Sequence, residues 1–228
     1  MLTPRRTFQC VPVAVPPIMD GCDHCHTLDP NRGNAAYRRV LWTVLGINAT
    51  MFLIEIGAGL AAGSASLQAD ALDFFGDAAN YAISLFVAGM VLRYRAVAAL
   101  VKASTMALFG LWIIGTSIWH TLQETLPSAI AMGTVGVLAL AANAASLGLL
   151  WARRDGDANM RSAWICARND VLGNLAVLIA AAGVFGASTG WPDVVVAAIM
   201  AILSLQGAWL VVRQSVFELR QGSLAPAE

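Results

Sequence analysis

Three aspartates interrupt an otherwise apolar stretch of this chain, and they constrain its fold more than any other feature. They lie in the segment Asp70-Ala-Leu-Asp73-Phe-Phe-Gly-Asp77. A charged carboxylate at the centre of a bilayer costs roughly 2.5–3.5 kcal/mol even on the more lenient insertion scales. Membrane helices keep such groups where they line a polar cavity, pair with a cation or carry protons. We therefore expect a buried polar site within a membrane domain.

The composition supports a helical membrane protein. Of the 228 residues, 58% are hydrophobic and only 12% are charged, whereas soluble domains carry about 25% charged residues. Long apolar runs without the alternation of a membrane barrel favour helices. The zero net charge gives no sign of nucleic-acid binding. The sequence thus predicts an all-α, multi-pass protein of the cell membrane, and we expect the inner membrane of a bacterium.

Six segments are long and apolar enough to cross a bilayer. Their limits are roughly 38–62, 67–91, 97–121, 127–151, 162–186 and 191–213. We assign about 37–215 to this six-helix transmembrane domain, 1–36 to a disordered tail and 216–228 to a short second tail, and expect no C-terminal regulatory domain.

The positions of the basic residues predict the orientation. In a six-span arrangement nearly all arginines, together with Lys102, fall on one side of the membrane. Glu124 and Asp193 are the charges that fall on the other side. Because basic residues concentrate on the cytoplasmic side, we expect both termini and both tails to be cytoplasmic.

A second polar stripe lies in the fifth segment, where Cys166, Asp170 and Asn174 recur at i, i+4 and i+8 on one helix face. Asp73 and Asp77 share the same spacing in the second segment. At about 1.5 Å per residue, both stripes reach similar depths from opposite membrane faces. Facing each other, they would offer carboxylates, a thiolate and an amide oxygen to a divalent cation.

The types of ligand limit which metal ions the site would favour. A mixture of oxygen and sulfur ligands favours Zn²⁺ or Cd²⁺. If Asn174 or Asn169 replaces Cys166 as the fourth ligand, the oxygen-rich set favours Mn²⁺, Fe²⁺ or Co²⁺. Alternatively, Asp170 forms a structural ion pair with Arg168 or Lys102.

Two other functions would use buried carboxylates. An intramembrane aspartyl protease needs aspartates from two helices, whereas the closest pair here, Asp73 and Asp77, shares one. An antiporter of small organic cations would explain the acidic groups but not their paired stripes. We therefore expect a transporter and not an enzyme.

Two groups of residues together resemble the cation diffusion facilitator family. The first is Asn48-x3-Phe52-x2-Glu55-x3-Gly59-x3-Gly63-Ser64-x-Ser66-Leu67-x2-Asp70-Ala71-x-Asp73-x3-Asp77, and the second is Asn159-x-Arg161 followed by Cys166-x3-Asp170-x3-Asn174. The resemblance implies a dimeric exporter that exchanges a cytoplasmic divalent metal for protons. We expect this metal to be Zn²⁺, with Cd²⁺ as a second substrate and Co²⁺, Fe²⁺, Mn²⁺ or Ni²⁺ as alternatives. The resemblance also implies a transport site at Asp73, Asp77 and Asp170, with Cys166 at the remaining position.

This chain departs from the family pattern in two respects. Members that transport zinc usually carry His at one or both leading positions of the paired motifs, where this chain has Asp73 and Cys166. Typical members also end in a soluble metal-binding domain that helps them to dimerise, and we expect no such domain here. We therefore expect a homodimer held by the transmembrane helices.

Further polar residues accompany these motifs. Asn48 and Glu55 share one face of the first segment, where we expect hydrogen bonds to the second or fifth segment or contact with the transport path. Asp70 is expected to act as a relay or as a bond between helices, and not as a ligand.

The N-terminal tail contains a compact group of potential metal ligands. These are Cys22, His24, Cys25 and His26. Cysteine and histidine tracts of this kind bind Zn²⁺, copper or nickel. The tract either collects cytoplasmic metal for the transport site or is a chelating sequence without a role in transport. No cofactor is expected apart from the transported metal.

Overall fold

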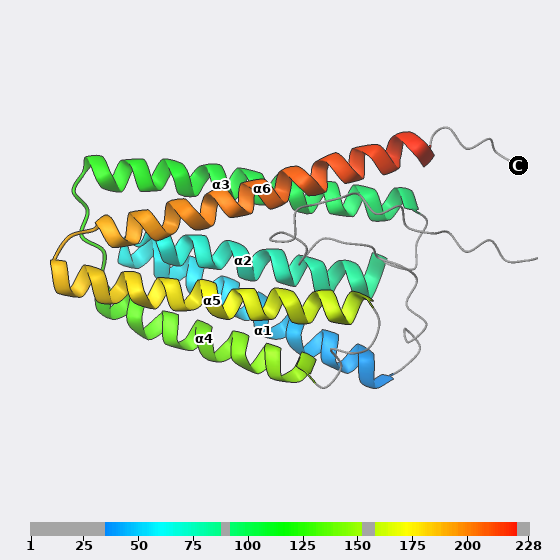
Figure 1. The fold of residues 1–228 in the computed structure, drawn as a ribbon, viewed down its shortest axis with the longest axis horizontal. Helices are drawn as coiled ribbons and strands as arrows, with labels where there is room; N and C mark the ends of the chain where they lie inside the picture. Colours follow the sequence, from blue (N-terminus) through cyan, green and yellow to red (C-terminus); the bar gives the residue numbers. More distant parts are fainter. Residues whose placement is uncertain (1–34, 88–91, 152–157, 223–228) are drawn as a thin grey trace, which may run out of the picture.

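The computed structural model describes residues 35–87, 92–151 and 158–222, and within these ranges the chain folds into helices without a strand. The helices are α1 (Ala35–Ala62), α2 (Ala65–Ala82), α3 (Leu92–Leu122), α4 (Ala129–Trp151), α5 (Ala158–Ala187) and α6 (Trp191–Gly222), as shown in Figure 1. A short π-helix, η2 (Ile83–Val87), continues α2. These helices coincide with the predicted segments, so the prediction of an all-α, six-helix membrane protein is confirmed. Helix α6 extends to Gly222, past the predicted domain end near 215.

Five of the helices have the length and hydropathy of membrane spans. These spans are Arg38–Ala62, Ala96–Leu122, Ala129–Trp151, Ala167–Ala187 and Trp191–Phe217. Helix α2 is the exception, because its aspartates lower its hydropathy. Twelve of its eighteen residues are buried within the bundle. The other helices therefore shield α2 from lipid.

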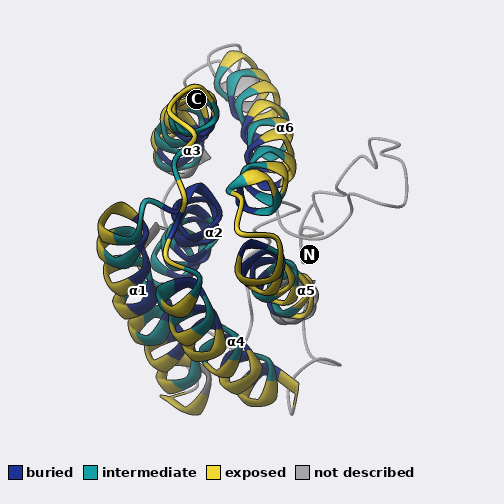
Figure 2. Cartoon of the chain, turned by 90° about the vertical axis from the view of Figure 1, so that its left-hand side faces the viewer, coloured by how far each residue is buried: buried dark blue, intermediate teal, exposed yellow. Residues whose placement is uncertain are grey.

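Helix α2 occupies the centre of the bundle (Figure 2). It contacts α1, α3, α5 and α6, while α3 packs mainly on α6 and α4 on α5. The largest apolar cluster lies where these helices meet and includes Leu67 and Leu72 of α2, Ile113 of α3, Val177 of α5 and Met200 of α6. Side chains on α2 are thus placed to meet residues from several other helices.

The connection between α1 and α2 is unusually tight. Gly63 adopts a left-handed backbone conformation with φ 63°. Its N–H donates to Leu60 O, and the Ser64 N–H donates to Gly59 O at 2.9 Å, which is the pattern of a Schellman helix end. Ser64 then caps α2, because its Oγ accepts a hydrogen bond from Leu67 N at 3.2 Å. The second helix begins as soon as the first one ends.

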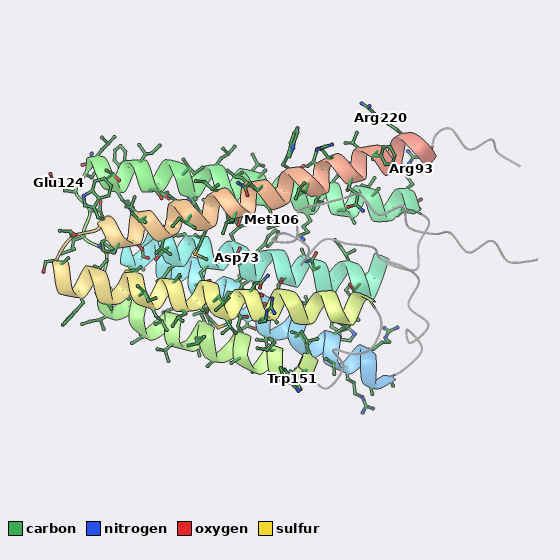
Figure 3. The ribbon with its side chains drawn as sticks, viewed as in Figure 1. Asp73, Arg93, Met106, Glu124, Trp151 and Arg220 are labelled. Atoms are coloured by element: carbon green, nitrogen blue, oxygen red, sulfur yellow. The ribbon has the colours of Figure 1, made fainter. Side chains whose placement is uncertain are left out.

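The charged residues are distributed unequally along the bundle (Figure 3). Arg93 and Arg220 lie at the end where α1 begins and α6 ends, whereas Glu124 lies at the opposite end. This distribution agrees with the charge pattern used to predict the orientation. That the arginine-rich end faces the cytoplasm stays a prediction.

Candidate metal site

The acidic face of α2 lies within the bundle. Asp70, Asp73 and Asp77 follow one another at about one turn of helix. Asp70 and Asp77 are buried and Asp73 is half-buried. Asp73 lies midway between the two ends of the bundle (Figure 3). The predicted depth of the acidic residues therefore agrees with their position along the helices.

Asp77 and Asp170 bring the two predicted stripes together. Their side chains, from α2 and α5, lie within hydrogen-bonding reach of each other, and Asp73 is close enough to repel Asp170 when both are charged. The hydroxyl of Tyr81, one turn farther along α2, lies beside Asp77. Because a low-dielectric interior strengthens the repulsion between like charges, this arrangement favours a cation or protons among the three carboxyl groups.

A second acidic pair lies beside the first. Glu55 of α1 is fully buried, and its carboxyl group lies within hydrogen-bonding reach of Asp70. Asn174 of α5 donates from Nδ2 to Asp70 Oδ1 at 3.4 Å and to its own helix at Asp170 O at 2.8 Å. Asp70 therefore forms the bond between helices that was expected of it, while Glu55 faces the second segment.

Several oxygens in this region receive no hydrogen bond. Among the described residues, they include both carboxylate oxygens of Glu55, Oδ2 of Asp70, Oδ2 of Asp170 and Oδ1 of Asn174. Buried oxygens without a donor are costly unless water, a proton or a cation satisfies them. The interior thus presents a concentration of acceptors suited to positively charged species.

The remaining predicted ligands have different positions. The Cys166 side chain lies outside the described residues, although its backbone belongs to α5. The tail ligands Cys22, His24, Cys25 and His26 also lie outside them. Asn169 is exposed on α5, so it faces away from the acidic pairs. Within the described ranges, no three His, Cys, Asp or Glu side chains form a ready metal group.

Lys102 provides a polar link between α3 and α2. It is buried, and its Nζ donates to Asn80 Oδ1 at 2.6 Å. Asn80 lies one turn beyond Asp77 on α2. The side chain that was considered as a partner for Asp170 therefore binds the α2 helix next to the acidic stripe.

Two residues near the site and one at the start of α2 were not anticipated from the sequence. Tyr81 continues the four-residue spacing of Asp73 and Asp77, so this spacing was the signal that pointed to it. Ser204 of α6 donates from Oγ to Asp73 Oδ1 at 3.3 Å. Asp193, counted from the sequence only as an outer charge, is buried and bonded to the start of α2.

Comparison with known proteins identifies the family. Residues 41–220 match the cation efflux transmembrane domain. The chain is 27% identical over 221 residues to zinc transporter ZitB of Escherichia coli, an alignment that covers 88% of this chain and 68% of that protein. It is 23% identical over 210 residues to the cadmium, cobalt and zinc/H(+)-K(+) antiporter of Bacillus subtilis, and this alignment covers 85% of this chain and 67% of that protein.

A third relative extends the comparison. The metal cation efflux system protein CzcD of Cupriavidus metallidurans is 23% identical over 214 residues, covering 89% of this chain and 66% of that protein. The chain thus spans about two thirds of the length of these relatives. Because the family match extends from α1 to α6, this multi-pass membrane protein belongs to the cation diffusion facilitator family.

Proposed function

We propose that this protein exports Zn²⁺ from the cytoplasm in exchange for protons, with Cd²⁺ as a second substrate. The observation that carries the proposal is the approach of Asp77 and Asp170 from two different helices, with Asp73 beside them. Paired carboxylates at the centre of a membrane domain are suited to a divalent cation. Family membership makes metal efflux the reaction to test first.

The ligand set supports zinc or cadmium through Cys166. Asp73, Asp77 and Asp170 supply hard oxygen ligands, and a thiolate from Cys166 would add the softer ligand that both ions accept. Without Cys166, the Asn174 oxygen would complete an oxygen set better suited to Mn²⁺, Fe²⁺ or Co²⁺. The name of the Escherichia coli relative, a zinc transporter, also favours zinc.

Protons drive the cycle in this proposal. Deprotonated carboxylates bind the metal while the site is open to the cytoplasm. When the site opens to the other side, protons compete for the same oxygens and displace the metal, because a ligand must be deprotonated to coordinate. The protonated site then returns. Asp73, Asp77 and Asp170 thus act in turn as metal ligands and proton carriers.

Two further parts of the proposal concern assembly and metal supply. We infer a homodimer formed through the transmembrane helices, with both termini in the cytoplasm. In this orientation the tail residues Cys22, His24, Cys25 and His26 would meet metal before it enters the bundle. The tract would then collect metal for the transport site.

The structure weakens one argument against an aspartyl protease, namely that the closest pair of aspartates shares one helix. Asp77 and Asp170 do come from two helices, so the shared-helix argument against a protease holds only for Asp73 and Asp77. Membership of a transporter family is the stronger reason to favour transport. Incubation of the purified protein with peptides, beside the metal assay, separates the two activities.

The central test is metal flux in proteoliposomes with an imposed pH gradient. Asp77→Asn keeps the size of the side chain but removes a charged ligand, so we expect zinc-driven proton flux to fall at least about tenfold. Glu124→Gln is the matched control, because this exposed residue lies at one end of the bundle. Full zinc-coupled flux in the Asp77→Asn protein would refute the proposed site.

A further inference from the structure

Helix α6 is joined to the metal-site helix α2 by polar contacts at two levels. The outer contact joins Asp193 to the start of α2. The inner contact joins Ser204 to Asp73. The two α6 residues are 11 positions apart, which is about 16 Å along a helix. Both helices begin at the same end of the bundle (Figure 1), so they run alongside each other in the same direction.

The outer contact fixes the position of α6 along α2. Asp193 is 1% exposed. Its Oδ1 accepts from Ser64 Oγ at 2.6 Å, from Ser66 Oγ at 2.6 Å and from Ser66 N at 3.0 Å, while Oδ2 accepts from Ala65 N at 2.8 Å. Backbone N–H groups at a helix start attract a negative charge. A slide of α6 by one residue would break this set of bonds.

The inner contact engages one oxygen of a proposed metal ligand. Ser204 is 7% exposed, and its hydroxyl donates to Asp73 Oδ1 at 3.3 Å. A carboxylate binds a metal through one oxygen or through both. When a hydroxyl holds Oδ1, the carboxylate is directed to bind through Oδ2.

We propose that Ser204 determines the metal specificity of the site, because it makes Asp73 bind the metal through one oxygen. The contact of Asp193 with the start of α2 holds Ser204 at the depth of Asp73. This inference rests on the proposed metal transport. One-oxygen binding keeps the coordination number low and suits tetrahedral Zn²⁺. Two-oxygen binding would raise the number of oxygen ligands, as Mn²⁺ prefers. Ser204 acts through Asp73, and is therefore a positioning residue.

The test compares zinc with manganese in Ser204→Ala. We measure the concentration of ZnCl₂ and of MnCl₂ that gives half-maximal flux in proteoliposomes, and the affinity of both ions for the purified protein by calorimetry. Loss of the hydroxyl should shift the zinc-to-manganese preference about tenfold toward manganese, the lower bound for residues that orient a ligand. Ser204→Thr retains a hydroxyl and should keep the wild-type preference.

Ser215→Ala is the matched control for the loss of a buried serine. Ser215 is 2% exposed and lies on the same helix, 11 residues beyond Ser204. If Ser204→Ala keeps the wild-type metal preference, as Ser215→Ala should, the role of Ser204 is overturned. Zinc transport by the wild-type protein would remain valid in that case. Absence of metal flux and binding in the wild type would instead defeat the proposed function, and this inference with it.

The depth-setting role of Asp193 is tested through Ser66. Ser66→Ala removes one donor to Asp193 while its backbone N–H remains. If the Asp193 contact acts through Ser204, Ser66→Ala should shift the metal preference of the otherwise wild-type protein. In the Ser204→Ala protein the same substitution should cause no additional shift, because the effects of residues that act through one another are not additive. Equal shifts in both backgrounds, or none in either, would overturn the part assigned to Asp193.

Discussion

At the scale of single residues, four of the buried acidic groups occur as two pairs, and the partners of each pair come from different helices. Asp77 faces Asp170 across α2 and α5, and Glu55 faces Asp70 across α1 and α2. Each partner alone would be a buried carboxyl group with few donors. When both partners of a pair are ionised, they carry two negative charges, which one divalent ion can neutralise. The same pairing means that replacement of one partner changes the electrostatic surroundings of the other.

Replacement of Cys166 tests the softest proposed ligand. Cys166→Ser exchanges a thiol for a hydroxyl of similar shape, so we expect Cd²⁺ flux to fall about tenfold while Mn²⁺ flux is retained. The measurement is flux of each metal in proteoliposomes with an imposed pH gradient. Cys10→Ser provides the control, because Cys10 precedes all six helices. Equal loss for both metals would argue against a thiolate ligand.

The sequence predicted the acidic residues that the fold brings together, and it missed Ser204 and Asp193, which contact α2 from α6. Asp77 and Asp170 were identified because charges are rare in apolar segments and recur there with helical spacing. Ser204 carries no such signal, since Ser117, Ser146 and Ser215 are equally buried in apolar helices. The role of Asp193 depends on the juxtaposition of two helix starts that are distant in sequence.

At the scale of elements, the junction of α1 and α2 determines where the acidic helix begins. Gly59 lies against the first turns of α2, and a Cβ there would be 3.0 Å from the backbone N of Gln68 and 3.2 Å from Leu67 Cβ. The spacing of Gly59 and Gly63 therefore serves contact and turning within one chain. The predicted limits of the first two segments, roughly 38–62 and 67–91, already imply a short junction, but the bond to Asp193 required the fold.

The close approach at Gly59 gives a stability prediction. Gly59→Ala should force α1 and α2 apart and lower the free energy of unfolding by roughly 1–3 kcal/mol, since a backbone atom cannot move aside as a side chain can. Gly57→Ala is the control, because a Cβ at Gly57 meets nothing within 4 Å. Thermal unfolding in detergent, followed by tryptophan fluorescence, compares the two variants. Equal midpoints would contradict the importance of this contact.

At the scale of the whole molecule, the bundle has two chemically different ends. One carries Arg93 and Arg220, together with the start of α1 and the end of α6, and the other carries Glu124 (Figures 1 and 3). Six helices return the chain to the side from which it starts. This molecular asymmetry follows from the charge pattern of the sequence and was predictable, whereas the central place of α2 was not.

Reporter fusions test the predicted orientation. Because the basic end is expected to face the cytoplasm, a green fluorescent protein fused after Gly222 should fluoresce, and alkaline phosphatase fused at the same point should be inactive. Alkaline phosphatase inserted after Glu124 should be active, since Glu124 lies in the connection between α3 and α4 at the opposite end. The reverse pattern of activities would invert the topology and the direction of transport.

The enclosure of α2 by its neighbours has a consequence for biogenesis. A helix that lacks the hydropathy of a span is poorly retained by an insertion machinery that sorts segments by their apolar character. Because only Gly63 and Ser64 separate it from α1, α2 is expected to enter the bilayer as the second arm of a hairpin. Its partner Asn174 is synthesised 104 residues after Asp70. During that interval Asp70 depends on water or a proton for the hydrogen bond that Asn174 later donates, and this donor exists only after the ribosome has made α5.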